Sequence, residues 1–438
     1  MGVNSQAGQV GFGLQSVKGT PDAATRFARL RSGSLGGDRT LMVPDAEIGG
    51  GRDIPGAYLG PVSFAGTYEF YPRMQMLALL MYAVLGAKSS SASSPTNEVQ
   101  TIATTGTPTG GTFKLRFRGQ TTGTIAFDAS ASAIDTALEA LSTIDPGEVT
   151  CAAGPLPTGV TVTFSGQYAG QNVPMLEVVQ SALTGGTAPA VTVTGSTPGM
   201  PPIGVHVETP ANAIPWISVE ERIGESLESF QYWDAKVNSL KLNAEATGYL
   251  MGSTDIIAAM SASGFTEQTT PDWDTTPMMV GGQVTITLDN AALGAKSFSL
   301  EINNNLETDD FNLGSLYLAA ITEKRRDIKM SCSYRPQDST MWKAAMYGDG
   351  SLTAPQAGPA YSGPVSILIE SFETIGDVVS GTPFSCLIEI PAAVVAPFKL
   401  NPSGDDVLQN DLEITAIQPD PVVPIITVTI TNDLATVS

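Results

Sequence analysis

The chain has very few of the residues that enzymes use for chemistry. His206 is the only histidine, so any Ser–His–Asp or Cys–His arrangement would have to use it. It lies in the segment PIGVHVETP, which we expect to be a loop–strand junction, and the sequence contains no GxSxG nucleophile elbow. We therefore predict that the protein is not an enzyme and that it has no catalytic residues.

Signatures of phosphate and metal sites are also missing. Gly11 and Gly13 are followed by no third glycine at the required spacing, and Lys18 is not in a GxxxxGK[ST] frame. The segment Asn303–Asn312 is rich in oxygen ligands that suit calcium, but it lacks the glycine and the ligand spacing of an EF-hand loop. We interpret it as a solvated or subunit-contacting loop, and Tyr347–Ser351 and Asn401–Asp406 as ordinary turns. We expect no cofactor-binding and no metal-binding residues.

Cysteine is scarce and has no pattern. The three cysteines, Cys151, Cys332 and Cys386, are far apart and form no CxxC pair. An odd number without spacing predicts reduced thiols in the core of a protein assembled in the cytosol, with a single disulfide as the alternative.

Charge is low, and most of it is negative. Charged residues make up 15% of the chain, with 22 Lys+Arg against 43 Asp+Glu and a net charge of −21. This balance argues against tight DNA binding, which needs a basic surface, although an acidic wall would let DNA slide past without sticking. The one basic run, Glu323–Lys329, contains no aromatic residue. We expect it to pair with acidic groups of a neighbouring subunit rather than with nucleic acid.

No apolar run is long enough to span a bilayer. The most apolar stretch, Met74–Leu85, is shorter than the roughly 20 residues that a membrane helix needs. The N-terminal residues lack a signal-peptide pattern, and Gln6 replaces the Ser or Thr of a myristoylation motif. We predict no membrane contact and a buried or interface helix over 74–85, with Pro72 near its start and Gly86 at its end.

The chain is rich instead in Gly (45), Pro (30) and alternating apolar residues, as in many short strands joined by turns. Apolar alternation predicts antiparallel strands in the segments 240–244, 284–288, 298–302, 365–369, 384–390, 412–417 and 425–433. A weak repeat, SLKLN (239–243) and SLEIN (299–303), precedes two segments that we expect to be helical, 253–260 and 313–321. The fold class is therefore mainly β.

Shifts in composition divide the chain. Residues 1–60 have little periodicity and predict an extended N-terminal arm. The linker KSSSASSPTNE introduces a small α+β unit over 97–199, inserted into a β domain made of 61–96 and 200–396. Residues 397–438 form a C-terminal arm with strands that pair within their own sheet or with a neighbour's.

Three stretches resemble the tail tube (major tail) proteins of long-tailed bacteriophages. They are the N-terminal block with GTPDAATRF, GGGRDIPGAYLG and LLMYAVLG, then ERIGESLESFQYWDAKVNSLKLNAEATGYL (221–250), and KSFSLEINNNLETDDFNLGSLYLAAITEKRRDIKMS (296–331). The segment 109–141 resembles a separate module that is often inserted in phage structural proteins.

This resemblance implies an antiparallel β-sandwich or barrel with a flanking helix, and the inserted module on the outer surface. Six subunits would form a ring, and rings would stack through the arms and a long loop around a lumen that conducts DNA during ejection. Tape measure and terminator proteins would be partners, in a virion tail assembled in the host cytoplasm. Alternatives are a capsid decoration or tail terminator protein, a bacterial secretion-tube relative, or a carbohydrate-binding adhesin that acts through residues 97–199.

Overall fold

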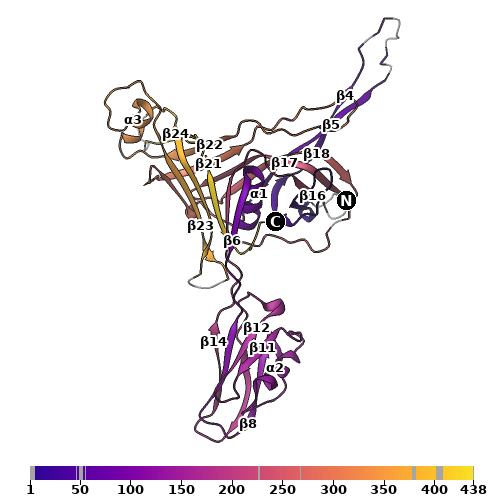
Figure 1. Cartoon of the computed structure of the whole chain (residues 1–438), viewed down its shortest axis with the longest axis vertical. Helices are drawn as coiled ribbons and strands as arrows, with labels where there is room; N and C mark the ends of the chain where they lie inside the picture. Colours follow the sequence, from indigo (N-terminus) through magenta and orange to yellow (C-terminus); the bar gives the residue numbers. More distant parts are fainter. Residues whose placement is uncertain are drawn as a thin grey trace.

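The computed structural model describes residues 5–45, 47, 48, 53, 54, 56–224, 227–266, 268–376, 381–400 and 408–437. It is elongated, with a β-rich body, a smaller module at one end and a hairpin that projects from the body (Figure 1). The strands pair in antiparallel fashion throughout the body and the module. The predicted mainly-β class is therefore confirmed, whereas the description as a sandwich or barrel stays a prediction.

The body is one 18-stranded sheet built from both halves of the chain. Its strands before the module are β1 (Gln9–Leu14), β2 (Arg26–Ala28), β3 (Leu30–Gly33), β4 (Gly36–Met42), β5 (Tyr58–Phe70) and β6 (Gly86–Ala92). The strands that follow the module are β15 (Gly204–Pro210), β16 (Ile217–Ile223), β17 (Glu228–Glu245), β18 (Met251–Ser263), β19 (Val284–Leu288), β20 (Ala291–Ala292), β21 (Ala295–Asn303), β22 (Asp327–Tyr334), β23 (Ser362–Thr374), β24 (Pro383–Val395), β25 (Asn410–Ala416) and β26 (Thr427–Asn432).

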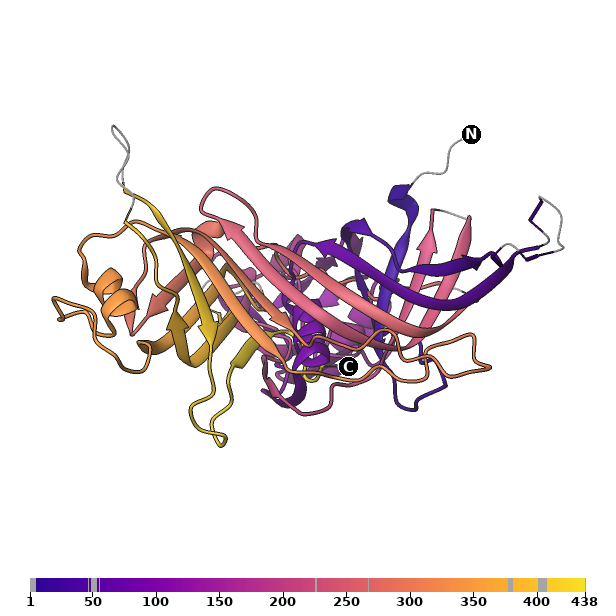
Figure 2. The same ribbon diagram turned by 90° about the horizontal axis from the view of Figure 1, so that it is seen from above.

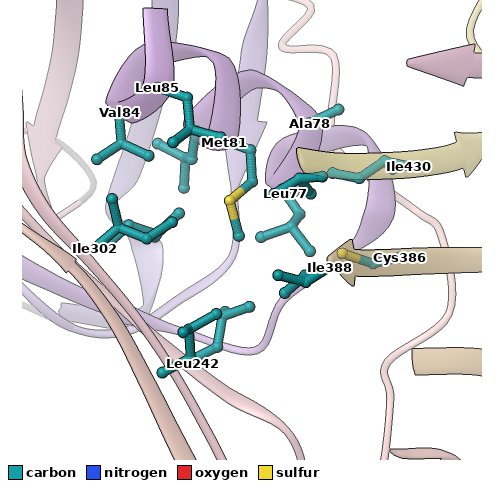
Figure 3. Packing of buried hydrophobic residues seen from close by; sticks show 14 of the residues in the cluster. Leu77, Ala78, Met81, Val84, Leu85, Leu242, Ile302, Cys386, Ile388 and Ile430 are labelled. Atoms are coloured by element: carbon teal, nitrogen blue, oxygen red, sulfur yellow. The ribbon is translucent and has the colours of Figure 1, made fainter. Parts of the chain in front are cut away.

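Helix α1 (Met74–Leu85) lies inside the body, as the sequence predicts. Eleven of its 12 residues are buried, because it packs against β17 on one side and against β15, β24 and β26 on another. Figure 3 shows Leu77 and Met81 among side chains of β17, β21, β24 and β26. A helix that is apolar on all faces needs such an enclosed position. It ends at Gly86, whose φ of 104° is left-handed and whose Cβ position lies 2.6 Å from the Ala213 carbonyl oxygen.

The two halves of the SLKLN/SLEIN repeat pair directly with each other, Ser239 opposite Asn303 and Asn243 opposite Ser299. The helices predicted after them are wrong. Residues 253–260 belong to β18, which is paired on both sides, with β17 and with β5. This pairing outweighs the local helical preference of the alanine-containing segment. Residues 313–321 form no helix and lie in a long loop between β21 and β22. The third helix of the described residues, α3 (Thr340–Tyr347), follows β22.

The module between β6 and β15 has a core of its own. Its strands form two four-stranded sheets, β8–β9–β10–β13 and β7–β11–β12–β14, and helix α2 (Ala131–Glu139) packs on β10, β11 and β12. The strand bounds are β7 (Val99–Thr105), β8 (Gly110–Phe117), β9 (Gln120–Thr121), β10 (Ile125–Ala126), β11 (Val149–Ala153), β12 (Val160–Phe164), β13 (Glu177–Thr184) and β14 (Ala190–Thr197). Phe117 and Phe164 stack in this separate core, and Tyr168 meets both rings edge-on. Whether the expected unit 97–199 folds independently stays a prediction.

Both ends of the chain contribute strands to the body sheet. Strand β1 pairs with β16, and Phe12 is buried in the body's core, so this part of residues 1–60 is an integral part of the sheet. At the other end, β26 lies between β15 and β24 of the same chain. Within the described residues, only the β4–β5 hairpin has the projecting character that we predicted for the N-terminal arm (Figure 2).

Candidate assembly surface

The β4–β5 hairpin carries apolar side chains that are exposed among the described residues. Leu41 and Leu59 are cross-strand partners, and 60% and 57% of their surfaces are exposed. The other large exposed apolar side chains of this hairpin are Met42, Val43, Ile48, Ile54 and Tyr58. A soluble monomer seldom exposes such a continuous apolar region, and one of this kind marks a contact with another molecule.

Buried hydrogen bonds fix the base of the hairpin. Leu35 is buried, and its N–H donates to the Glu221 carboxylate at 3.1 Å. The hydroxyl of Tyr68 donates to the same carboxylate oxygen at 3.2 Å, and the hydroxyl of Tyr232 donates to the Leu35 carbonyl. Burial raises the pKa of Glu221, although these two donors oppose the shift. The hairpin therefore projects from a rigid base.

Two glycines let the backbones cross closely at this base. A Cβ on Gly33, whose φ is +117°, would lie 2.1 Å from the Thr67 carbonyl oxygen, and one on Gly66 would lie 2.1 Å from that of Ser34. A side chain at either position would push β5 apart from the β3–β4 side of the hairpin.

The loop between β21 and β22 extends the same apolar surface. It packs on the outer side of the sheet through a small cluster that includes Leu306, Leu318 and Ile321. Its far end reaches β5, where the Val62 N–H donates to the Leu316 carbonyl at 2.8 Å. Leu313 and Leu316 are exposed there. The hairpin and this loop together form what we call the assembly ledge, made of Leu41–Val43, Tyr58, Leu59, Leu313 and Leu316.

The acidic and basic residues of this loop have partners in their own chain. Lys236 is buried and donates to Glu323 at 2.6 Å, and Arg326 donates to the carbonyls of Leu85 and Ala211. Arg325 pairs with Asp327 at 2.9 Å. These contacts lie within one chain and leave the side chain of Arg325 88% exposed, so the expected pairing of the run 323–329 with a neighbouring subunit stays a prediction.

The loop shows no metal geometry. Within the described part of the chain, no group of three or more His, Cys, Asp or Glu side chains could hold a metal ion. Asn304 instead donates to the carbonyls of Val84 and Val237. Segment 347–351 is a turn that follows α3, with Gly348 as its left-handed cap, while the turn predicted at 401–406 lies outside the described residues.

His206 links three strands of the body. It is fully buried on β15, with Nδ1 2.9 Å from the Ser90 hydroxyl on β6 and Nε2 3.0 Å from the Asn432 amide oxygen on β26. Burial is the main reason that its pKa is lowered, so the ring is neutral at pH 7. Its bonding partners are structural, and none is a carboxylate that could orient it as a general base.

The cysteines are unpaired thiols. Cys332 and Cys386 are buried in the body and Cys151 is half-buried in the module. Burial raises the pKa of all three, to about 12 for Cys332, so none is an activated nucleophile. In the described residues, no helix has the length and apolar character needed to cross a membrane.

The body matches a known family over its centre. Residues 218–416, from β16 to β25, match the family described as phage tail tube protein. A stretch of 102 residues, 23% of this chain, is 36% identical to the tail sheath protein of Mycobacterium phage Bxz1, and it covers 16% of that protein. The chain thus aligns with about a sixth of that relative's length. These two matches support a structural protein of a phage tail, and the tail tube and sheath proteins that they name are not enzymes.

Proposed function

We propose that this protein is the major subunit of a phage tail tube, which assembles into stacked hexameric rings and conducts DNA during ejection. The observation that carries the proposal is the match of residues 218–416 to the tail tube family, because these residues form most of the body sheet. The assembly ledge supports it, since its exposed apolar side chains need a partner surface.

The charge of the chain suits the passage of DNA. A net charge of −21 would give a lumen that repels phosphate and lets the genome slide without binding. In this proposal the module lies outside the ring, and the tape measure and terminator proteins are the further partners. The protein is then part of the virion tail after assembly in the host cytoplasm.

The ledge provides a direct test. Replacing Leu41 and Leu59 by Asp places charge on a surface that is exposed in the free subunit, and circular dichroism checks that the hairpin tolerates the two like charges on opposite strands. If another subunit buries these side chains, each replacement removes about 1.5–3 kcal/mol of apolar burial. We expect long hollow tubes of six-fold rings from the wild-type protein in negative-stain electron microscopy, and soluble subunits from the double variant.

A matched control is Val422→Asp, which adds a charge at an exposed apolar position outside the ledge and should leave assembly unchanged. Tubes of normal length from the Leu41→Asp/Leu59→Asp variant would show that the ledge is not an assembly surface. A wild-type protein that forms no hollow polymers would contradict the tube proposal itself and favour a decoration or terminator protein.

A tail sheath subunit is a second candidate, favoured by the match to the sheath protein of phage Bxz1. In that case the protein would form an outer layer around a tube made of another protein. Antibodies against this protein, applied to purified tails before and after removal of any outer layer, distinguish the tube candidate from the sheath candidate. Label that is lost with the outer layer supports the sheath candidate.

A further inference from the structure

The segment that follows β26 folds back onto the body sheet. The Leu434 N–H donates to the Asn432 side-chain oxygen at 2.9 Å. The Leu434 carbonyl oxygen lies so close to β15 that a Cβ on Gly204 would be only 1.7 Å from it. Val437 is buried in the main core cluster of the body. We call residues 434–437 the strap, which begins beside β15 and ends in the core.

Lys88 of β6 holds the far end of the strap. Its ammonium group donates to the Val437 carbonyl and lies 4.4 Å from the centroid of the Tyr82 ring on α1. No carboxylate among the described residues forms an ion pair with Lys88. A neutral carbonyl is a weaker partner for an ammonium group than a carboxylate is, so an anionic group within reach of Lys88 would bind it more strongly.

Such a group lies on the neighbouring strand. Glu208 of β15 is directly opposite Lys88 in the register of the two strands, and it is opposite Val428 of β26 on its other side. Side chains at opposite positions of antiparallel strands share a face and have Cβ atoms about 5 Å apart. The Glu208 side chain is fully buried, and neither of its carboxyl oxygens bonds to another described residue. The carboxyl group and the ammonium group are therefore neighbours that do not bond to each other.

The Glu208 side chain points into the core beneath α1. His206, two positions before it on β15, is opposite Ile430 of β26. Ile430 lies beside Leu77 of α1 (Figure 3). Alternate residues of a strand point to the same face, so Glu208 faces the same apolar side of the sheet. A carboxylate in such surroundings is costly unless a cation pairs with it, so the ionisation of Glu208 and the position of Lys88 are linked.

The titratable groups around Glu208 leave Lys88 as its counter-charge. Burial raises the pKa of Glu208 to about 8, and the charge of Lys88 opposes this shift. Burial lowers the pKa of His206, so that ring is neutral when Glu208 ionises. On β24, burial and then the charge of Glu208 raise the pKa of the Cys386 thiol, which therefore stays protonated. Tyr82 of α1 contacts Lys88 through its ring. Lys88 is thus the group that responds when Glu208 loses its proton.

We propose that Lys88 is a switch with two partners, the Val437 carbonyl while Glu208 is protonated and the Glu208 carboxylate after it ionises. In the second state Glu208 has released its proton to solvent and forms a buried ion pair with Lys88, while Val437 loses the bond that holds it. The strap then leaves β15, which uncovers Gly204 and exposes the apolar side chain of Val437. This device belongs to the single subunit and does not depend on the proposed function.

The mobility of the strap tests the switch. A nitroxide on Thr436→Cys, at an exposed position of the strap, reports its motion by electron paramagnetic resonance in the free subunit. The background is Cys151→Ser, since the other two cysteines are buried and protected from the label. Because the carboxyl pKa of Glu208 is higher in the held state than in the released state, a rise in pH favours release. If pairing with Lys88 lowers that pKa by about one unit or more, the ratio of mobile to immobile label should rise by about tenfold or more between pH 6 and pH 9.

Two variants separate the switch from a general effect of pH. Glu208→Gln cannot ionise, so the label should stay immobile at both pH values. Lys88→Met removes the shared cation, so the label should be mobile already at pH 6 and should respond little to pH. The matched controls Glu389→Gln and Lys329→Met change exposed residues of β24 and β22 and should keep the wild-type response.

Thermal unfolding checks the fold of each labelled variant, and Glu208→Gln alone still decides the question if Lys88→Met does not fold. A label that stays immobile at pH 9 in the otherwise unchanged protein would overturn the inference. The same conclusion follows if Glu208→Gln or a folded Lys88→Met responds to pH as the unchanged protein does.

Discussion

The body and the module are both built from alternating strands, but they hide their apolar residues in different ways. The module closes two small sheets over a core that its own residues supply, between β7 and β14. The body needs β1 from the start of the chain and β26 from its end, and it encloses the helix α1. The module thus depends on contacts within a short segment, whereas the body depends on contacts across the whole chain.

Both regions bury polar side chains as well as apolar ones. The body buries several carboxylates, including Glu208, Glu220 and Glu221, and raises the pKa of each. Glu220 and Glu221 accept hydrogen bonds from the backbone of the segments that enter the hairpin. The module uses the same device, since buried Glu98 accepts from the Gly199 N–H and buried Gln100 accepts from the Leu176 N–H.

The largest change in the free energy of unfolding is expected from a substitution that leaves a cavity in the core of the body. Leu77 is fully buried in α1, and Leu77→Ala should cost about 2–5 kcal/mol of stability through lost burial and an unfilled cavity. If the two cores are independent, calorimetry will show a lowered transition for the body and an unchanged one for the module. Leu138→Ala, at a fully buried position of α2, should lower the unfolding transition of the module and leave that of the body unchanged. A single transition that moves with both variants would show that the two regions unfold together.

This contrast also explains which parts of the fold the sequence could predict. The helix over 74–85 and its end at Gly86 follow from local residue types, and the strands with one apolar face follow from alternation. The strand β18 was missed because its pairing on both sides comes from segments remote in sequence. Local patterns record local preferences, and the body is the region where remote contacts decide.

The candidate surface was predictable only in part. The low periodicity of residues 1–60 predicted an extended arm, but it did not reveal that β1 is part of the sheet. Leu41 and Leu59 look like core residues in the sequence, and only the paired hairpin shows that both are exposed.

A smaller effect, dependent on pH, is expected from Glu208. It is fully buried opposite Lys88 on β6, and its carboxylate has no hydrogen-bond partner in another described residue. Burial raises its pKa to about 8, so the folded protein holds a proton that the unfolded chain loses above pH of about 4.3. This group's contribution to stability therefore falls as the pH rises from about 4 to about 8.

Glu208→Gln removes that dependence, because the amide stays neutral. We expect the variant to be more stable than the wild type at pH 9, by on the order of 1–4 kcal/mol, and nearly equal to it at pH 4. Chemical denaturation at several pH values measures the difference. Glu389→Gln, at an exposed position of β24, is the control and should leave the pH profile unchanged. A Glu208→Gln profile parallel to that of the wild type would show that this carboxyl group is already ionised in the folded body.

Removal of the module should have the smallest effect on the stability and assembly of the body, although it is the largest change to the chain. Strands β6 and β15, on either side of it in sequence, pair up to Ala92 opposite Gly204, and the Ser93 N–H donates to the Ile203 carbonyl at 3.0 Å. The two chain ends left by excision of 97–199 are therefore adjacent, and a short turn can join them. Because the module has its own core, we expect the body's unfolding temperature and tube assembly to be unchanged. Shorter tubes, or a body that no longer folds, would show that the module contributes to the ring and is not an appendage of it.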